Sequence, residues 1–164
     1  MMRIGFGYDS HRFEEGRRLV LGGVEFPGEV GLKGHSDADV LIHAIVDALL
    51  GAAALGDIGS HFPDTDPQWK DADSAKLLEA VVKEVHAAGY QISNVDATVI
   101  CERPKLRPKV DEIRARLSQL LNIPTSRLSI KGKTNEKMDD VGAGIGIEVH
   151  AVALLEEKGS GIGD

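Results

Sequence analysis

Three residues in the first part of the chain have side chains typical of metal ligands. Asp9 and His11 are two positions apart at the end of a strand expected over residues 3–9, and such side chains point to the same face of an extended chain. His43 lies near the start of an apolar helix. One carboxylate and two imidazoles are the donors of catalytic zinc sites that keep a fourth position open. The same residues also fit a simpler interpretation: a capping Asp9, a surface His11 and a hydrogen-bonded core His43.

Further polar groups are suited to bind phosphate, hydroxyls or cations, and each also has a plain structural explanation. His35 precedes a helix N-terminus, whose amides and dipole favour anions, but it is equally a loop histidine beside a cap. Residues 56–66 form an acidic loop that turn chemistry alone also explains. Residues 103–109 are basic, and residues 131–137 add cations, a hydroxyl and the carboxylate of Glu136. Both stretches are otherwise solvated surface.

The polar residues around the first helix favour a structural role. Ser36 is a good N-cap, and Asp39 completes a capping-box spacing, so a helix is expected over residues 36–55. Asp37 and Asp39 are better explained by the helix dipole than by catalysis. Asp47 lies one turn beyond the candidate histidine ligand. It either orients that imidazole or is only a carboxylate on the helix face.

The periodicity of apolar residues predicts the elements that must position these groups. The clearest strand has apolar side chains alternating from Ala143 to Leu155, and glycines at every second position from Gly142 to Gly146 indicate a bare strand face in close contact with a neighbour. The order of elements predicts one α+β domain over residues 1–157 with helices packed on one face of a sheet, followed by a tail over residues 158–164. The strands are expected at 3–9, 18–26 (bulged at Gly22-Gly23), 92–102, 127–133 and 143–155, and the helices at 36–55, 73–88 and 108–121.

Composition excludes several classes of function. The chain has 164 residues, the size of one domain, and 42% of them are hydrophobic, so its core needs no staple. The net charge of -7 argues against nucleic-acid binding, which needs a basic face. The single cysteine, Cys101, precludes an intramolecular disulfide. Because the N-terminus has no apolar signal core and no apolar run is long enough to span a bilayer, the sequence predicts a cytoplasmic protein without a membrane partner.

Taken together, the motifs resemble those of a known enzyme family. Their order and spacing are similar to those of the 2-C-methyl-D-erythritol 2,4-cyclodiphosphate synthases, enzymes of the non-mevalonate route of isoprenoid and terpenoid biosynthesis. The resemblance covers about residues 2–157. It rests on Tyr8-Asp9-Ser10-His11, Gly34-His35-Ser36-Asp37-Ala38-Asp39, His43, Asp47-Ala48-Leu49-Leu50-Gly51, Gly56-Asp57-Ile58-Gly59, Phe62-Pro63-Asp64-Thr65-Asp66, Pro104-Lys105 and Thr134-Asn135-Glu136.

The resemblance implies a fold, an activity and a set of metals. The fold would be a mixed sheet in a ferredoxin-like or chorismate-mutase-like arrangement, assembled as a homotrimer whose subunits share active sites. The enzyme would be a phosphorus–oxygen lyase that cyclises 4-diphosphocytidyl-2-C-methyl-D-erythritol 2-phosphate by attack of its 2-phosphate on the β-phosphorus, releasing CMP. Asp9, His11 and His43 would hold one Zn²⁺ per subunit. Glu136 would hold a second divalent cation, Mg²⁺ or Mn²⁺.

The resemblance also assigns the residues that would contact the small cytidyl diphosphate substrate. His35 and Thr134 would stabilise the transition state, and Ser36 would contact a phosphate through its amide. The erythritol hydroxyls would contact Asp57, Ile58, Gly59, Phe62, Pro63, Asp64, Thr65 and Asp66. The cytosine would be framed by residues 101–107, including Cys101, Pro104, Lys105, Leu106 and Arg107, and further contacts would come from Lys133 and Asn135.

The chain departs from the family's pattern after Glu136. Met138-Asp139-Asp140 replaces the usual Leu-Gly-Phe, and Ala143 and Ile145 replace an arginine and a glutamate that line the trimer's central passage. These changes predict a more apolar passage and altered contacts near residue 140. Two rival functions stay open at this point: a zinc-dependent nucleotide phosphoesterase with the same ligands, and a non-catalytic trimeric module that binds cytidine nucleotides.

Overall fold

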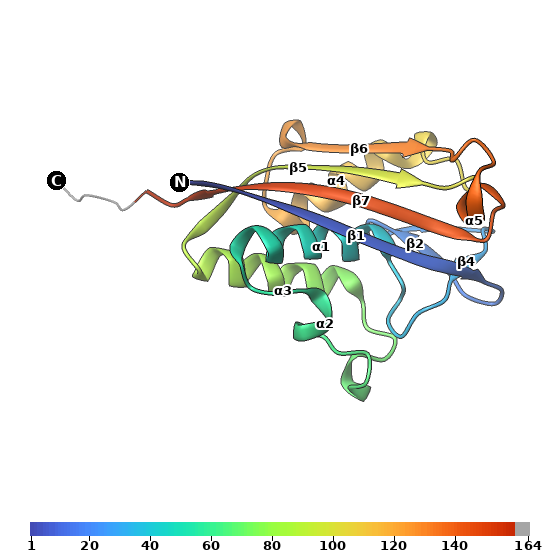
Figure 1. Cartoon of the computed structure of the whole chain (residues 1–164), viewed down its shortest axis with the longest axis horizontal. Helices are drawn as coiled ribbons and strands as arrows, with labels where there is room; N and C mark the ends of the chain where they lie inside the picture. Colours follow the sequence, from blue (N-terminus) through green and yellow to red (C-terminus); the bar gives the residue numbers. More distant parts are fainter. Residues whose placement is uncertain (160–164) are drawn as a thin grey trace.

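A computed structural model, which describes residues 1–159, is built around one five-stranded sheet (Figure 1). Its strands are β1 (Met2–Glu14), β4 (Gly31–Leu32), β5 (Tyr90–Ile100), β6 (Leu128–Lys133) and β7 (Gly146–Glu157). Their order is β4-β1-β7-β5-β6. All neighbours are antiparallel except β5 and β6, which are parallel and therefore need a long crossover connection.

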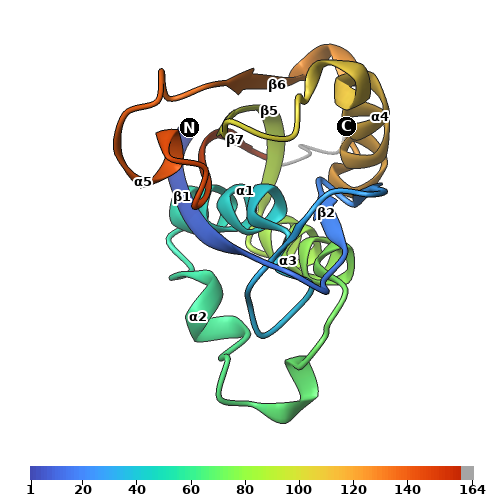
Figure 2. The ribbon, with the colours of Figure 1, turned by 90° about the vertical axis from the view of Figure 1, so that its right-hand side faces the viewer.

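Three long helices cover one face of this sheet (Figure 2). They are α1 (Val40–Ala53), α3 (Ser74–Ala87) and α4 (Val110–Leu121), and α4 forms the crossover from β5 to β6. Short helices α2 (Ile58–His61) and α5 (Asp139–Gly142) lie in the connections. The predicted α+β class, with helices on one face of a mixed sheet, is confirmed. Among the helices of residues 1–159, none has both the length and the apolar character needed to cross a bilayer.

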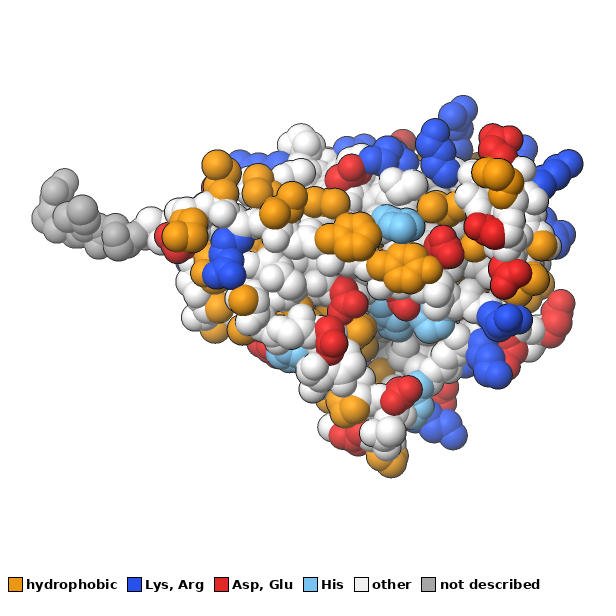
Figure 3. Space-filling view, viewed as in Figure 1, with side chains coloured by type: hydrophobic (Ala, Val, Ile, Leu, Met, Phe, Trp, Pro, Cys, Tyr) orange, Lys and Arg blue, Asp and Glu red, His pale blue; other side chains and the backbone are white. Residues whose placement is uncertain are grey.

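The two faces of the sheet differ because successive strand residues point to opposite sides. On the helix-covered face, Val99, Val149 and Ala151 are buried and form a core with the apolar residues of α1. On the other face, Ile4 is 73% and Phe6 61% exposed. Figure 3 shows hydrophobic side chains running across this open face. A single chain thus completes one side of its sheet and leaves the other uncovered.

Two glycines bring α1 very close to β1. A Cβ atom on Gly5 would lie 1.9 Å from the carbonyl oxygen of Ala48, and one on Gly7 would lie 1.8 Å from that of Ala44. Both glycines are on the helix-covered face, two and four positions before Asp9. Every second residue of β1 is on this face. Asp9 and His11, which follow the two glycines on it, therefore point toward α1 as well.

The start of α1 differs from the prediction. Asp39, not Ser36, is the N-cap, because its carboxylate accepts a hydrogen bond of 3.0 Å from Ile42 N. Ala38 has a φ of 57°, which the right-handed helix does not allow, so the helix starts after it. The carboxylate of Asp39 also accepts hydrogen bonds from the backbone of residues 22–23, which explains why it is fully buried.

The single bulged strand predicted for residues 18–26 is also wrong. The segment forms two short strands, β2 (Leu19–Leu21) and β3 (Val24–Phe26), which pair with each other in a separate ribbon. Gly22 and Gly23 have φ values of 64° and 73° and make the turn between them. Two successive positive φ values are typical of a tight hairpin turn.

The last strand starts later than predicted. Ala143 and Ile145 precede β7 and are exposed, because residues 139–142 form α5 and Gly144 turns the chain with a φ of 77°. The strand pattern predicted for residues 143–145 is therefore wrong. Only Gly146 of the alternating glycines lies on a strand.

Close contact is confirmed at Gly146, where a Cβ would lie 2.4 Å from the carbonyl oxygen of His11. The predicted elements over 73–88, 92–102, 108–121 and 127–133 are found within two residues of their expected bounds. Strand β1 continues beyond its predicted end to Glu14. Residues 160–164 of the expected tail lie outside the described residues.

Candidate active site

The three candidate metal ligands converge between β1 and α1. Oδ2 of Asp9 lies 3.0 Å from Nε2 of His11 and 3.1 Å from Nδ1 of His43. One donor atom from each residue lies within 4.8 Å of the other two. Donors that converge on one point in this way fit a single cation, and the set of two nitrogens and one oxygen suits zinc.

The electrostatics of the cluster also favour a cation. Burial acts to raise the pKa of Asp9, but hydrogen bonds from His11 and His43 outweigh it and lower this pKa to about 2. Burial acts to lower the pKa of His11, whereas the hydrogen bond and charge of Asp9 outweigh that effect and raise it. Asp9 is therefore a carboxylate at neutral pH, with its charge between two nitrogen donors.

The second ring nitrogen of His43 has its own partners. His43 is 9% exposed, and its Nε2 lies 2.9 Å from Oγ of Ser74 and 3.3 Å from Oγ of Ser36. Of the two roles considered for Asp47, the structure favours the structural one, because its Oδ1 accepts a 2.8 Å hydrogen bond from Ile58 N. Two hydroxyls from different segments, and not the carboxylate one turn away, hold this imidazole.

The loop that carries His35 is held from two sides. The guanidinium of Arg17 donates hydrogen bonds to the carbonyl oxygens of Gly34 (2.5 Å) and Ser36 (2.6 Å), one residue before and one after His35. Nε2 of His35 lies 3.2 Å from the carbonyl oxygen of Asp66. His35 thereby links the segment beside the metal cluster to the acidic loop.

The acidic loop is folded and not an open turn. Asp57 is the N-cap of α2, and its Oδ1 accepts hydrogen bonds from the backbone and hydroxyl of Ser60 at 2.8 and 2.6 Å. Phe62 packs edge-on against Trp69, with ring centroids 5.0 Å apart, and so anchors the loop. Asp57 and residues 64–65 are exposed. The loop therefore presents polar groups to solvent from a fixed base.

The other predicted substrate residues follow β5 and β6 at one end of the sheet. Cys101 N donates a 2.9 Å hydrogen bond to the carbonyl oxygen of Lys133, which joins the two segments. Burial raises the pKa of Cys101 to about 11, so this thiol is protonated and is not a nucleophile at neutral pH. The stretch alternates between buried side chains (Pro104, Leu106) and exposed ones (Lys105, Arg107).

The segment after β6 is exposed and has an unusual backbone. Glu136, Lys137 and Asp139 have φ values of 50°, 59° and 56°, which side-chain-bearing residues rarely adopt. Oε1 of Glu102 accepts hydrogen bonds from Asn135 N at 3.0 Å and Lys137 N at 3.4 Å, and so holds this path. Backbone held in rare conformations is typical of functional sites.

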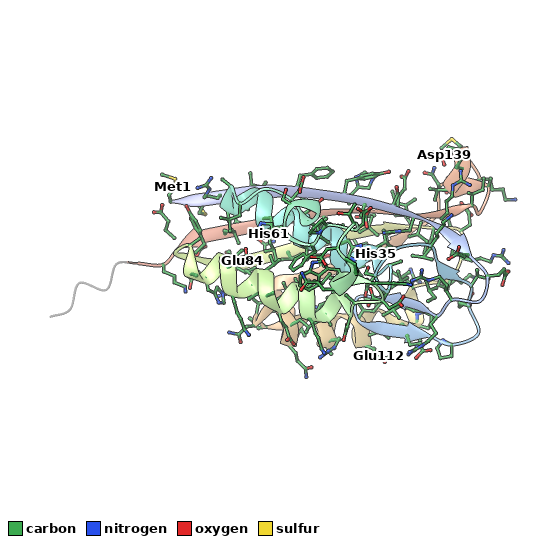
Figure 4. All side chains as sticks on the ribbon, turned by 90° about the horizontal axis from the view of Figure 1, so that it is seen from below. Met1, His35, His61, Glu84, Glu112 and Asp139 are labelled. Atoms are coloured by element: carbon green, nitrogen blue, oxygen red, sulfur yellow. The ribbon has the colours of Figure 1, made fainter. Side chains whose placement is uncertain are left out.

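The candidate metal ligands and the predicted residues after β6 do not meet within one chain. Strand β1, which carries two of the candidate metal ligands, is separated from β6 by β7 and β5. At a strand spacing of about 4.8 Å, β6, the strand that leads into Thr134 and Glu136, lies roughly 14 Å from β1. Glu136 is not part of the metal cluster, which is the one such group in residues 1–159. In Figure 4, Asp139 from the segment after β6 lies away from His35.

Sequence reasoning missed three residues that support the site: Arg17, Ser74 and Glu102. Only Ser74 could have been singled out from its neighbours in the sequence. It follows Asp73, which already caps α3, so a second cap-type residue inside the helix had no local role. Arg17 and Glu102 contact residues far along the chain, and no spacing in the sequence reveals such contacts.

Comparison with known proteins decides the family. Residues 2–156 match the YgbB family. The chain belongs to that family. Over 156 residues it is 56% identical to a protein of Brachyspira hyodysenteriae named 2-C-methyl-D-erythritol 2,4-cyclodiphosphate synthase, covering 95% of this chain and 99% of the relative. The chain is accordingly a cyclodiphosphate synthase, a lyase of the non-mevalonate isoprenoid route, as the motifs implied.

Solved structures agree with this assignment. The chain superposes with a TM-score of 0.93, at 37% identity, on a bifunctional enzyme named IspDF from Campylobacter jejuni; the match covers 96% of this chain and 43% of that one. A 2-C-methyl-D-erythritol 2,4-cyclodiphosphate synthase in its CDP-bound form superposes with a TM-score of 0.86 at 42% identity, over 94% of this chain and all of the other.

Proposed function

We propose that this chain converts 4-diphosphocytidyl-2-C-methyl-D-erythritol 2-phosphate to 2-C-methyl-D-erythritol 2,4-cyclodiphosphate. An oxygen of the substrate's 2-phosphate attacks the β-phosphorus and closes an eight-membered ring. The bond from that phosphorus to the cytidyl phosphate breaks, and CMP leaves with the electron pair. Because the substrate contains its own nucleophile, the protein's task is to orient a flexible polyanion so that oxygen and phosphorus meet in line.

The cluster of Asp9, His11 and His43 is the observation that carries this proposal. These residues would hold Zn²⁺ and leave one position open for a phosphate oxygen. When bound, the cation supplies positive charge that reduces the repulsion between the two phosphates. A chain with a net charge of -7 needs such a source of local positive charge to hold a polyanion.

His35 and the acidic loop would hold the middle of the substrate. The ring of His35, which contacts a backbone carbonyl 3.2 Å away, can instead donate its hydrogen to a phosphate oxygen, and the amide of Ser36 would add a second donor. The exposed polar groups of Asp57 and of residues 64–65 would accept hydrogen bonds from the erythritol hydroxyls. The walls of this subsite would come from Ile58, Gly59, Phe62, Pro63 and Asp66.

The second group of residues would complete the site from a neighbouring subunit. Glu136 would hold a second divalent cation, Mg²⁺ or Mn²⁺, and Thr134 would contact the phosphate under attack. Residues 101–107 would frame the cytosine, with buried apolar side chains as a wall and cationic ones at the rim. The CDP-bound relative supports a cytidyl ligand. Lys133 and Asn135 would add contacts beside Thr134.

The open face of the sheet supports assembly as a homotrimer. Ile4 and Phe6 are the most exposed apolar residues of its central part, and Tyr8 and Val152 extend the same stripe. The rings of Phe6 and Tyr8 lie 5.8 and 5.1 Å from the ring of His150. Exposed apolar patches of this kind mark protein interfaces. Covering the stripe with neighbouring subunits would bring the edge of one sheet to the metal cluster of the next.

The axial passage of such a trimer is a separate expectation. Ala143 and Ile145 are exposed in the single chain and would be available to line the passage. The apolar passage predicted from these two residues stays a prediction. A crystal structure of the trimer with an anion bound to their segment would contradict it.

An assay of the purified protein with the cytidyl substrate tests the proposed reaction. Magnesium is supplied throughout, zinc is removed from one sample, and the products are followed by phosphorus NMR. We expect CMP and a cyclic diphosphate, lost on zinc removal and restored by added zinc. CMP with a linear bisphosphate would show a phosphoesterase instead. No CMP from zinc-loaded protein that binds CDP would show a nucleotide-binding module.

A further inference from the structure

A short chain of buried polar groups leads away from the metal cluster through His43. Nε2 of His43 lies 2.9 Å from Oγ of Ser74, the first residue of α3, whose side chain is fully buried. Ser74 in turn gives both of its hydrogens to Asp37: the hydroxyl donates to Oδ1, and the backbone N–H donates to Oδ2 at 3.0 Å. Three segments of the chain meet at this point.

The hydrogens in this series of hydrogen bonds, from His43 through Ser74 to Asp37, can be assigned one by one. A serine hydroxyl has a single hydrogen, and a carboxylate only accepts. Because Ser74 donates its hydroxyl hydrogen to Asp37, its oxygen can only accept from the imidazole, so Nε2 of His43 carries the hydrogen. Oγ of Ser36, 3.3 Å from the same nitrogen, can accept it as a weaker second partner. Nδ1, 3.1 Å from Oδ2 of Asp9, is the nitrogen that would give up its hydrogen bond to Asp9 and bind a cation.

We infer that Ser74 and Asp37 are positioning residues for the metal site, which fix the ring orientation and the Nε2–H tautomer of His43. This inference rests on the proposed zinc site. A carboxylate that acts on a histidine through a hydroxyl also increases the electron density at the metal-binding nitrogen. Groups in this position around protein metal sites change metal affinity by about 10- to 100-fold when removed.

The arrangement is not needed to build the helix on which Ser74 lies. The N-cap of α3 is Asp73, whose side chain accepts a 2.9 Å hydrogen bond from Ala75 N. Ser74 points the other way, to the loop before α1. A purely structural role for Ser74 and Asp37 would therefore be to hold this loop against α3. Metal affinity and folding stability, measured in the same variants, distinguish this role from positioning of the metal ligand.

The pair also lies where the metal site and the acidic loop are joined. Asp37 N donates to the carbonyl oxygen of Ala72 at 3.1 Å, and Asp71 N donates to that of His35 at 2.8 Å. The segment that carries Asp37 is thus tied to residues 71–72, which lie between the acidic loop and α3, and it contacts a candidate metal ligand through Ser74. Removing Ser74 or Asp37 should therefore weaken metal binding first and should also affect the position of His35.

Metal affinity of the intact protein is the direct test. Zinc dissociation constants would be measured by competition with a chromophoric chelator for the wild type, Ser74→Ala, Asp37→Asn and the double variant. The matched control is Asp73→Ala, which removes a cap of the same helix one residue away. Thermal unfolding of metal-free protein would report on folding in every variant.

We expect Ser74→Ala and Asp37→Asn each to weaken zinc binding by about 10- to 100-fold, with little further loss in the double variant, because both break one chain of hydrogen bonds. Asp73→Ala should lower the melting temperature by roughly 2–4 °C and leave zinc affinity within about twofold. Cobalt-substituted Ser74→Ala should show a changed visible spectrum, which a docking role would not produce.

Three outcomes would overturn the inference. If the wild type binds zinc and both single variants bind it as tightly, the pair does not position His43, while the proposed metal site stands. If the wild type binds no zinc, the proposed site itself fails and the inference fails with it. Equal losses of affinity in Asp73→Ala and Ser74→Ala would show that the pair acts only through the fold.

Discussion

The metal-ligand region and the segment after β6 differ in how much of each a single chain completes. Around the metal cluster, Ser74 is fully buried and Ser36 and His43 are each 9% exposed, and their polar atoms have partners within the same chain. In contrast, residues 131–140 are almost entirely exposed, and their rare backbone conformations are held chiefly by Glu102.

This difference suggests that the two regions of each subunit contribute to different active sites of the proposed trimer. Each subunit builds a finished metal site and presents a second, unfinished surface that becomes part of a site only beside a neighbour. The open sheet face, with its exposed apolar stripe, is the element that would join the two. Damage to the finished region and damage to the shared one should therefore have different consequences for zinc binding and assembly.

The largest effect is expected from Gly7→Ala. Its new Cβ would lie 1.8 Å from the carbonyl oxygen of Ala44 and would push α1 away from β1. We expect a loss of about 3 kcal/mol in the free energy of unfolding, measured with urea, together with loss of zinc. The control is Gly51→Ala in α1, where the nearest atom is 4.0 Å away and alanine should be neutral or slightly stabilising. A Gly7→Ala protein as stable as the wild type would contradict the close packing.

His11→Ala should spare the fold and remove the metal. The side chain of His11 is 18% exposed, and its ring provides one of three donors to the cluster. We expect loss of bound zinc and a fall of at least about 100-fold in CMP formation, with the melting temperature of metal-free protein little changed. His86→Ala on α3, outside the cluster, should keep both zinc and activity. Full zinc content in His11→Ala would refute the ligand assignment.

Phe6→Asp should break the shared region without touching the finished one. A carboxylate in the middle of the apolar stripe would oppose burial between subunits. We expect dissociation by analytical ultracentrifugation and a loss of activity of about 10-fold at micromolar protein, with one zinc still bound per chain. Glu112→Lys, on the opposite side of the molecule (Figure 4), should stay trimeric. Loss of zinc on dissociation would contradict the independence of the two regions.

The smallest change in activity is expected on treatment with a thiol-alkylating reagent, because Cys101 should not react. Burial raises its pKa to about 11, above the ordinary value of 9.0, so the reactive thiolate is scarce in the folded protein until the pH approaches 11. Brief iodoacetamide treatment at pH 8 should leave activity nearly unchanged, and mass spectrometry should find the thiol unmodified. Labelling should increase as pH rises or on unfolding. Rapid modification of native protein at pH 8 would contradict the burial of this segment.

The sequence predicted best what depends on local periodicity. The long helices and strands follow from apolar spacing. The spacing of Asp9, His11 and His43 only allowed a metal site, and the family motifs around them made it the expectation. The start of α1 was missed because Ser36 has good cap chemistry, yet Ala38 turns the chain before the helix starts. In residues 143–145, alternating apolar residues imitate a strand, but α5 and the turn at Gly144 intervene. Arg17 and Glu102 act across long sequence separations that local patterns do not encode.

The central claim is that each active site combines the metal cluster of one subunit with the residues after β6 of another. Two inactive variants, His11→Ala and Glu136→Gln, would be refolded together and the mixed trimers confirmed by native mass spectrometry. If sites are shared, random mixing leaves about a quarter of them intact, and the mixture should regain about that fraction of wild-type CMP formation. Mixed trimers that are as inactive as either variant alone would contradict the claim.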